Sequence, residues 1–65
     1  MTDATGIVKD IIEKLTANTK SILTEKVFNI AAERGIGDML VKDSLNELME
    51  QNYIMMPVHG VLKRL

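Results

Sequence analysis

The sequence predicts a small α+β domain made of three short helices and a small antiparallel sheet. Two observations predict this class: apolar residues recur at helical spacing in three separate stretches, and the last fifteen residues contain two short apolar runs joined by a Pro and a Gly. The 65 residues are enough for one domain with a small core. We expect residues 1–6 to form a flexible N-terminal segment and residues 7–65 to form the domain.

The first helix is expected in the stretch GIVKDIIEKL, where apolar residues recur three and four positions apart. Asp3 or Thr5 can cap its start. Asp10 lies four residues before Lys14, an order that favours an ion pair on the exposed side of a helix. A polar connector, residues 16–21, is expected to follow. The apolar stripe consists of Ile7, Val8, Ile11, Ile12 and Leu15.

A very short strand, residues 22–23, is expected to lead directly into the second helix. Thr24 is a suitable N-cap, and Glu25 places an acid in the first turn, where the helix dipole favours it. The helix is expected to end at Gly35, because glycine readily adopts the left-handed conformation of a C-terminal cap. Its inward residues are expected to be Val27, Phe28, Ala31 and Ala32.

The third helix is expected to follow the sequence GIGD, with Asp38 as its N-cap and Asn52 ending it in the left-handed conformation. Two short amphipathic helices joined by a turn of about three residues are typical of a helix-turn-helix. The apolar stripe of this helix is Leu40 or Val41, followed by Leu45, Leu48 and Met49.

The C-terminal stretch is expected to be a β-hairpin with strands at residues 53–56 and 61–65. Pro57 presets one backbone angle of the turn, and Gly60 can supply a positive φ where the second strand begins. The pattern leaves open which side of the second strand is buried: Leu62 with Arg64, or Val61 with Leu65. Residues 22–23 are expected to pair with the hairpin as a third strand, because a two-stranded hairpin is marginal alone.

This order of elements, helix, strand, helix, helix, strand and strand, is that of a winged-helix domain, in which the hairpin is the wing. Over residues 7–65 the sequence also resembles the C-terminal winged-helix domain of archaeal minichromosome maintenance (MCM) replicative DNA helicases. The resemblance lies in VKDIIEKL and in AAERGIGDMLVKDSLNELMEQNYI, followed by a strand, a Pro, a Gly three residues later and a final VLKRL.

The resemblance implies a role as a non-catalytic accessory domain. In this family the parent is a hexameric, ATP-driven DNA helicase, and the domain is tethered to it and modulates its ATPase and unwinding activity. The expected partners are the ATPase core of the parent or other replication proteins, with weak DNA contact in addition. None of the helicase's catalytic residues lies in the matching region, so we expect no enzyme activity and no cofactor in this domain.

Composition narrows the function classes further. A net charge of −1 argues against strong, nonspecific nucleic-acid binding, which usually requires a basic domain. No apolar run approaches the roughly 20 residues that cross a bilayer, and the first residues lack the pattern of a signal peptide. We therefore expect a cytoplasmic protein without membrane contact, and a monomer when the domain is isolated.

Individual residues give little sign of chemistry. In a phosphate-binding loop the glycines run into Lys and Ser or Thr, whereas GIG here runs into Asp38. The single histidine, His59, reads either as a polar turn residue or as a metal, proton-transfer or nucleic-acid contact. We expect Met55 and Met56 to fill the core, the alternative being an exposed binding strip.

The charge of the third helix argues against ordinary DNA reading. Helix-turn-helix proteins place the second helix of the pair in the major groove, where outward acids would face phosphates. From Asp38 to Gln51 the sequence has one lysine and four acids, a net charge of −3. We therefore expect its outward side to contact protein; the candidate residues are Lys42, Asp43, Asn46, Glu47 and Glu50.

A small cationic cluster is the candidate site for DNA. If residues 22–23 run antiparallel beside the last strand, Lys20 comes near Lys63 and Arg64. With His59 these are the candidate DNA contacts, and the alternative is a solvated sheet edge whose lysines deter aggregation. The leading function is therefore the helicase accessory domain; the alternative is a DNA-binding winged-helix module of a transcriptional regulator.

Overall fold

The computed structural model describes residues 3–65 and has three helices and one three-stranded antiparallel sheet, which confirms the α+β class. The predicted order of elements is also confirmed. The elements are α1 (Ala4–Leu15), β1 (Ser21–Leu23), α2 (Thr24–Glu33), α3 (Asp38–Glu50), β2 (Ile54–Val58) and β3 (Val61–Arg64).

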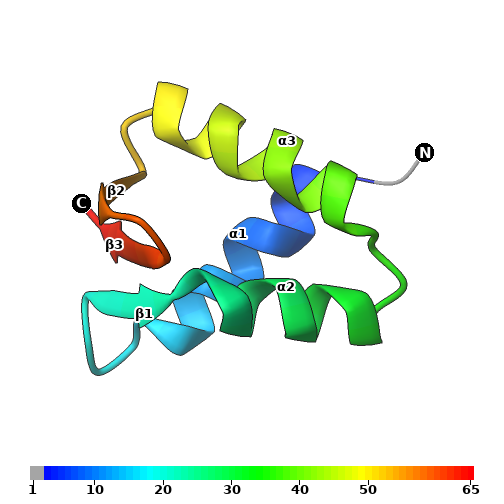
Figure 1. Cartoon of the computed structure of the whole chain (residues 1–65), viewed down its shortest axis with the longest axis horizontal. Coiled ribbons are helices and arrows are strands. Elements are labelled where there is room, and N and C mark those ends of the chain that lie inside the picture. The colour runs from blue at the N-terminus through cyan, green and yellow to red at the C-terminus, as the bar shows by residue number, and fades with distance from the viewer. Residues whose placement is uncertain (1–2) are drawn as a thin grey trace.

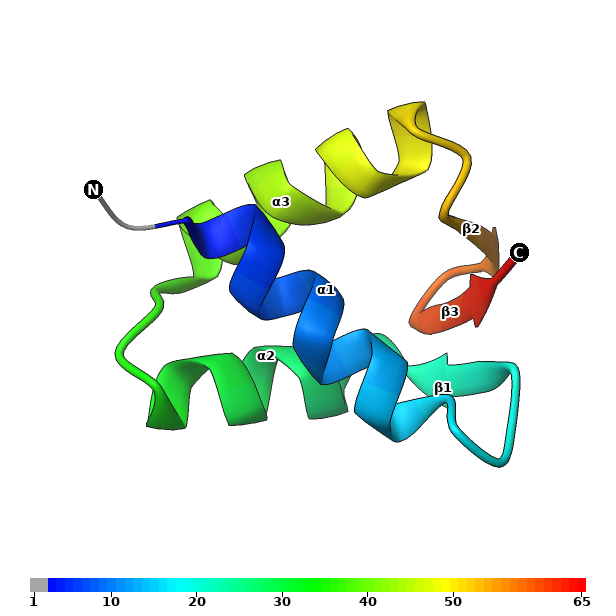
Figure 2. The same cartoon turned by 180° about the vertical axis from the view of Figure 1, so that it is seen from behind.

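The three helices form one body and the sheet lies at one end of it. α2 and α3 lie on either side in Figure 1, and α1 crosses between them, as the view from behind in Figure 2 also shows. In the sheet the strand order is β1-β3-β2, so the last strand of the chain is the central one. The central strand β3 contributes Leu62 to the core that the three helices share.

The start of α1 lies earlier than the predicted domain boundary at residue 7. Asp3 is the N-cap, and its Oδ1 accepts a hydrogen bond of 2.9 Å from the backbone N–H of Gly6. Residues 4–6 are therefore helical, whereas residues 1–2 of the predicted flexible segment lie outside the described residues. The predicted ion pair is confirmed, since Lys14 Nζ lies 3.1 Å from Asp10 Oδ2.

The predicted caps Thr24 and Asp38 are both wrong by one residue. The N-cap of α2 is Leu23, because the backbone N–H of Thr24 donates to the carbonyl of Gly60 at 3.1 Å and so extends the sheet to the first helical residue. The N-cap of α3 is the extended Gly37, which has no side chain to accept a bond. Asp38 instead lies in the first turn, where its negative charge interacts favourably with the helix dipole.

The helix ends follow the prediction. Gly35 has a φ of 80° after α2, and Asn52 has a φ of 60° after α3. Past Gly35 the backbone N–H of Ile36 donates to the carbonyl of Ala31 at 2.9 Å, and the Ile36 side chain is buried. The left-handed glycine therefore both ends α2 and returns an apolar residue to the core.

The hairpin is tighter than predicted and contains an irregularity. β2 extends to Val58, which pairs with Val61, so the turn is His59 and Gly60 alone, with Gly60 at a φ of 82°. Met55 pairs with Lys63, and β2 therefore has one more residue than β3 between these two pairs. Such a bulge at Met56 and Pro57 suits a residue that has no N–H to donate.

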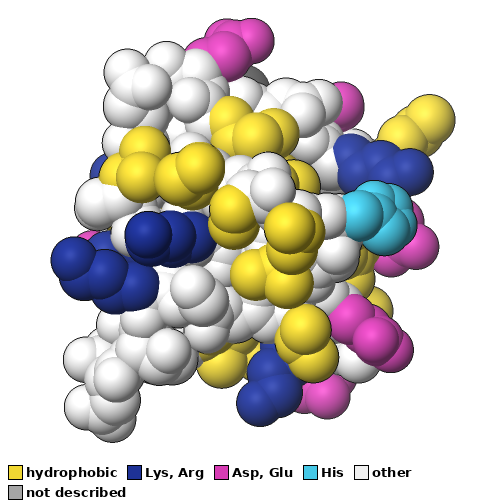
Figure 3. Space-filling view, turned by 60° about the vertical axis from the view of Figure 1, so that its left-hand side comes forward, with side chains coloured by type: hydrophobic (Ala, Val, Ile, Leu, Met, Phe, Trp, Pro, Cys, Tyr) yellow, Lys and Arg dark blue, Asp and Glu magenta, His cyan; other side chains and the backbone are white. Residues whose placement is uncertain are grey.

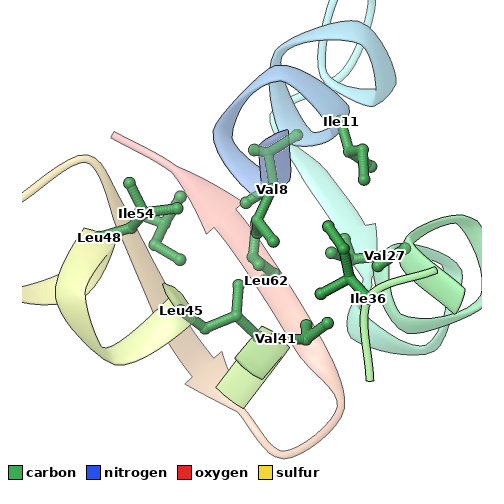
Figure 4. Packing of buried hydrophobic residues seen from close by; sticks show 11 residues of the cluster. Val8, Ile11, Val27, Ile36, Val41, Leu45, Leu48, Ile54 and Leu62 are labelled. Atoms are coloured by element: carbon green, nitrogen blue, oxygen red, sulfur yellow. The ribbon is translucent and has the colours of Figure 1, made fainter. Parts of the chain in front are cut away.

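Buried apolar residues from all three helices and two strands form one core, which Figure 4 shows around Leu62. Leu62 is fully buried and Leu65 is exposed, which decides the facing of β3 in favour of the set that contains Leu62. In α3 the inward residue is Val41, not Leu40. The core consists of Val8, Ile11, Ile12, Val27, Ala31, Ile36, Val41, Leu45, Leu48, Ile54 and Leu62.

Three residues predicted to be inward are not. Ala32 is exposed, because α2 turns Val27 and Ala31 toward the core instead. Met55 and Met56 are 39% and 37% exposed, so they do not fill the core. Met55 pairs with Lys63 on the outer side of the sheet, and the bulge interrupts the alternation that would have turned Met56 inward.

Candidate functional site

The predicted approach of Lys20 to Arg64 is present. β1 pairs antiparallel with β3, with Ser21 opposite Lys63. One residue further along, the backbone N–H of Arg64 donates a hydrogen bond of 2.8 Å to the carbonyl of Lys20. Both residues line an open hollow of about 550 Å³, together with residues 16–19 and Leu65. This hollow has two cations and several polar groups on its walls, and none of its lining residues is an acid.

A third cation joins this region through an aromatic ring. Lys9 Nζ lies 4.8 Å from the centroid of the Tyr53 ring, and Arg64 Cζ lies 5.9 Å from the same point. Both distances are within the range of cation–π attraction. We define the basic cluster as Lys9, Lys20 and Arg64, which come from α1, the loop before β1, and β3.

Tyr53 contacts two of these three cations, Lys9 and Arg64. Its hydroxyl oxygen is buried and has no hydrogen-bond partner among the described residues. Burial raises the pKa of the Tyr53 hydroxyl, and the nearby Glu13 carboxylate raises it further, while Arg64 opposes both. The neutral phenol therefore serves as a platform for two cations and not as an acid or base near neutral pH.

Two predicted members lie apart from the basic cluster. Lys63 pairs with Ser21 and Met55, all three exposed on the outer side of the sheet, whereas its neighbours Leu62 and Arg64 face inward. His59 lies in the turn at the opposite end of β3 from Arg64. The sequence missed Lys9, because only the packing of α1 against the end of the hairpin brings it to Tyr53.

The predicted protein-contact residues lie on one outward arc of α3, but its two sides differ. Lys42 and Asn46 border a groove beside the hairpin. Glu47 lies on the other side, where its Oε2 accepts a 2.8 Å hydrogen bond from the hydroxyl of Thr5 on α1. Asp43 and Glu50 are exposed. The acids are therefore directed away from the groove that Lys42 borders.

The groove, defined by the residues that line it, runs between α2, α3 and the hairpin turn. Its volume is about 290 Å³. The lining is mostly apolar, and its only ionisable residues are Lys42 and His59. Figure 3 views the sheet end of the molecule, with hydrophobic side chains across the middle of that face and the single histidine at its right-hand margin. The lining residues are Thr24, Phe28, Lys42, Leu45, Asn46, Met49, Met56, His59 and Gly60.

Neither region gathers the side chains of a metal centre. Within residues 3–65 no three His, Cys, Asp or Glu side chains come together as metal ligands. In the same residues no helix is both long and apolar enough to span a bilayer. What the described surface offers is a cationic hollow and an apolar groove, both of which suit binding.

Comparisons with known proteins add no identity to this picture. The sequence matches no protein-family model, no curated protein and no solved structure.

Proposed function

We propose that this chain is a winged-helix domain that serves as a non-catalytic accessory of an MCM-type replicative DNA helicase. The order of elements and the β1-β3-β2 sheet support a winged helix, with α2 and α3 as the helix-turn-helix and the β2–β3 hairpin as the wing. The resemblance over residues 7–65 supports the helicase assignment. The domain would modulate ATPase and unwinding activity through contacts with the ATPase core or with other replication proteins.

One observation carries the choice of a protein contact over DNA reading: the helix that would enter the major groove is acidic on its outward arc. Asp43, Glu47 and Glu50 are all exposed there, and each would face phosphates. At 4 Å one such pair of charges repels by about 1 kcal/mol even in bulk water, and more near a protein surface. An apolar groove beside the same helix is the surface that a protein partner would use.

Weak DNA contact is proposed at the basic cluster. Lys20 and Arg64 line a hollow that contains no residue of α3 and no acid, so phosphates could approach these two cations without meeting the acids of α3. None of the three cluster residues is placed on a helix that could enter the major groove with base-reading geometry. We therefore expect contact that depends on salt and not on sequence.

Deleting residues 7–65 from the full-length protein that carries them tests the proposal. ATPase and unwinding rates are expected to change by severalfold without being lost, because the domain would act on an ATPase module elsewhere in the chain. A parent with a ligand-binding domain in place of an ATPase would favour the transcriptional-regulator alternative. Complete loss of hydrolysis would contradict the accessory role, since it would place an essential catalytic element in this domain.

A further inference from the structure

We infer that the groove between α2, α3 and the hairpin turn binds an amphipathic, acidic helical segment of a partner protein. The inference rests on the proposed protein-contact role and names the chemistry of the partner. It starts from the lining: Phe28, Leu45, Met49 and Met56 supply apolar surface from three elements. Met56 is 37% exposed, and methionine side chains adapt readily to the shape of a bound segment.

The charges along the groove decide the sign of the partner. Lys42 is the only residue of the lining that carries a formal charge, and that charge is positive. Within residues 3–65 no carboxylate forms an ion pair with Lys42. The nearest acids of α3 by sequence, Asp43 and Asp38, do not line the groove. Lys42 is therefore free to pair with a carboxylate of a bound segment.

The shape and the sheet edge decide the form of the partner. A volume of about 290 Å³ lies just below the roughly 300–1,000 Å³ of small-molecule sites, so the groove suits a few side chains better than a cofactor. Strand addition is disfavoured at β2, because Pro57 has no N–H and the bulge interrupts the edge. A helix that inserts apolar side chains at helical spacing remains, with acids beside them to meet Lys42.

Titration with two synthetic peptides tests this inference on the intact chain. Both peptides are helical, of equal length and with the same leucine stripe, but one has glutamates beside the stripe and the other has lysines. Isotope-labelled methionine methyl groups report the site by NMR, because Met49 and Met56 line the groove whereas Met39 and Met55 do not. The glutamate peptide is expected to shift Met49 and Met56, and the lysine peptide to bind at least about tenfold more weakly.

Two charge-reversal variants supply the matched comparison. Lys42→Glu is expected to weaken the glutamate peptide about tenfold and to strengthen the lysine peptide. Lys63→Glu makes the same change in net charge on the outer side of the sheet, and is expected to leave both affinities unchanged within twofold. If Lys42→Glu fails to fold, Lys42→Gln decides the point by a smaller loss in the same direction.

Several results would overturn the inference. These are equal affinity for both peptides, no methyl shift with either, larger shifts at Met39 and Met55 than at Met49 and Met56, or equal effects of the two variants. The peptide titration measures the groove directly, whereas the deletion experiment measures the parent enzyme. If neither peptide binds the groove but the deletion changes the ATPase rate, the groove inference is rejected and the accessory role stays in place. If the glutamate peptide binds but the deletion changes neither ATPase nor unwinding rate, the helicase assignment alone is rejected.

Discussion

Replacing Leu62 with alanine is expected to remove much of the stability of this domain. Leu62 has no exposed surface, lies on the central strand and pairs with Ile22 across the sheet. Truncating a buried leucine costs about 2–5 kcal/mol, because apolar contacts are lost and a cavity remains. A 65-residue domain has a total free energy of unfolding of only about 3–10 kcal/mol. The variant is therefore expected to be partly or largely unfolded at room temperature.

Urea denaturation followed by circular dichroism measures this effect, with Leu65→Ala as the matched control. Leu65 follows directly after β3, three residues beyond Leu62, and is 60% exposed. Its truncation is therefore expected to cost less than about 0.5 kcal/mol. A loss below about 1 kcal/mol for Leu62→Ala would contradict the expected cavity cost. Equal losses for the two variants would refute the inward facing of Leu62 itself.

Two further predictions concern charged groups. For DNA, three phosphate contacts by the basic cluster give a log–log salt slope of about −2.7, which Lys20→Ala should reduce by about 0.9 while Lys42→Ala leaves it unchanged; a larger effect of Lys42→Ala would favour docking through α3. The hydrogen bond from Lys14 lowers the pKa of Asp10 below its ordinary value of 3.8, with Arg34 contributing. The charged Asp10 therefore stabilises the folded state above about pH 4 to 5, and this stabilisation is lost as the pH falls through the lowered pKa. Between neutral and acidic pH, the urea midpoint of Asp10→Asn should fall less than that of the unmodified protein. Identical pH profiles of the two proteins would contradict this reasoning.

The helices could be predicted from sequence because their signals are local. The stripe in α1, the left-handed residues Gly35 and Asn52, and the Asp10–Lys14 pair all depend on neighbours within about one turn. The N-caps could not be placed to the residue by the same means. Thr24 is held by a backbone bond to Gly60, a partner that is distant in the chain and that no local pattern specifies.

The facing of the hairpin lay beyond the sequence pattern for a similar reason. Both sides of residues 61–65 carry apolar residues, and the choice between them depends on how β1 pairs with β3. The prediction that Met55 and Met56 are buried is wrong for two different reasons. Met55 is on the outer side of the sheet opposite Lys63, whereas the bulge at Met56 and Pro57 breaks the pairing that would have turned Met56 inward.

The candidate sites were predictable only in part. The pairing of Lys20 with Arg64 followed from the expected third strand, but Lys63 points to the other side of that sheet because adjacent residues alternate. Lys9 required the packing of α1 on Tyr53, which is a tertiary contact. The groove requires three elements at once, and nothing in the spacing of Phe28 or His59 identifies it.

The central position of β3 also determines when the domain can fold during synthesis. Ile22 and its partner Leu62 are about 40 positions apart, so a nascent chain that ends near Gly60 contains all three helices but no strand between β1 and β2. The side of the helical core that packs on Leu62 would remain uncovered until residues 61–64 leave the ribosome. Because contacts between distant positions form late, we expect the helices to form early and the whole domain to fold in one late step.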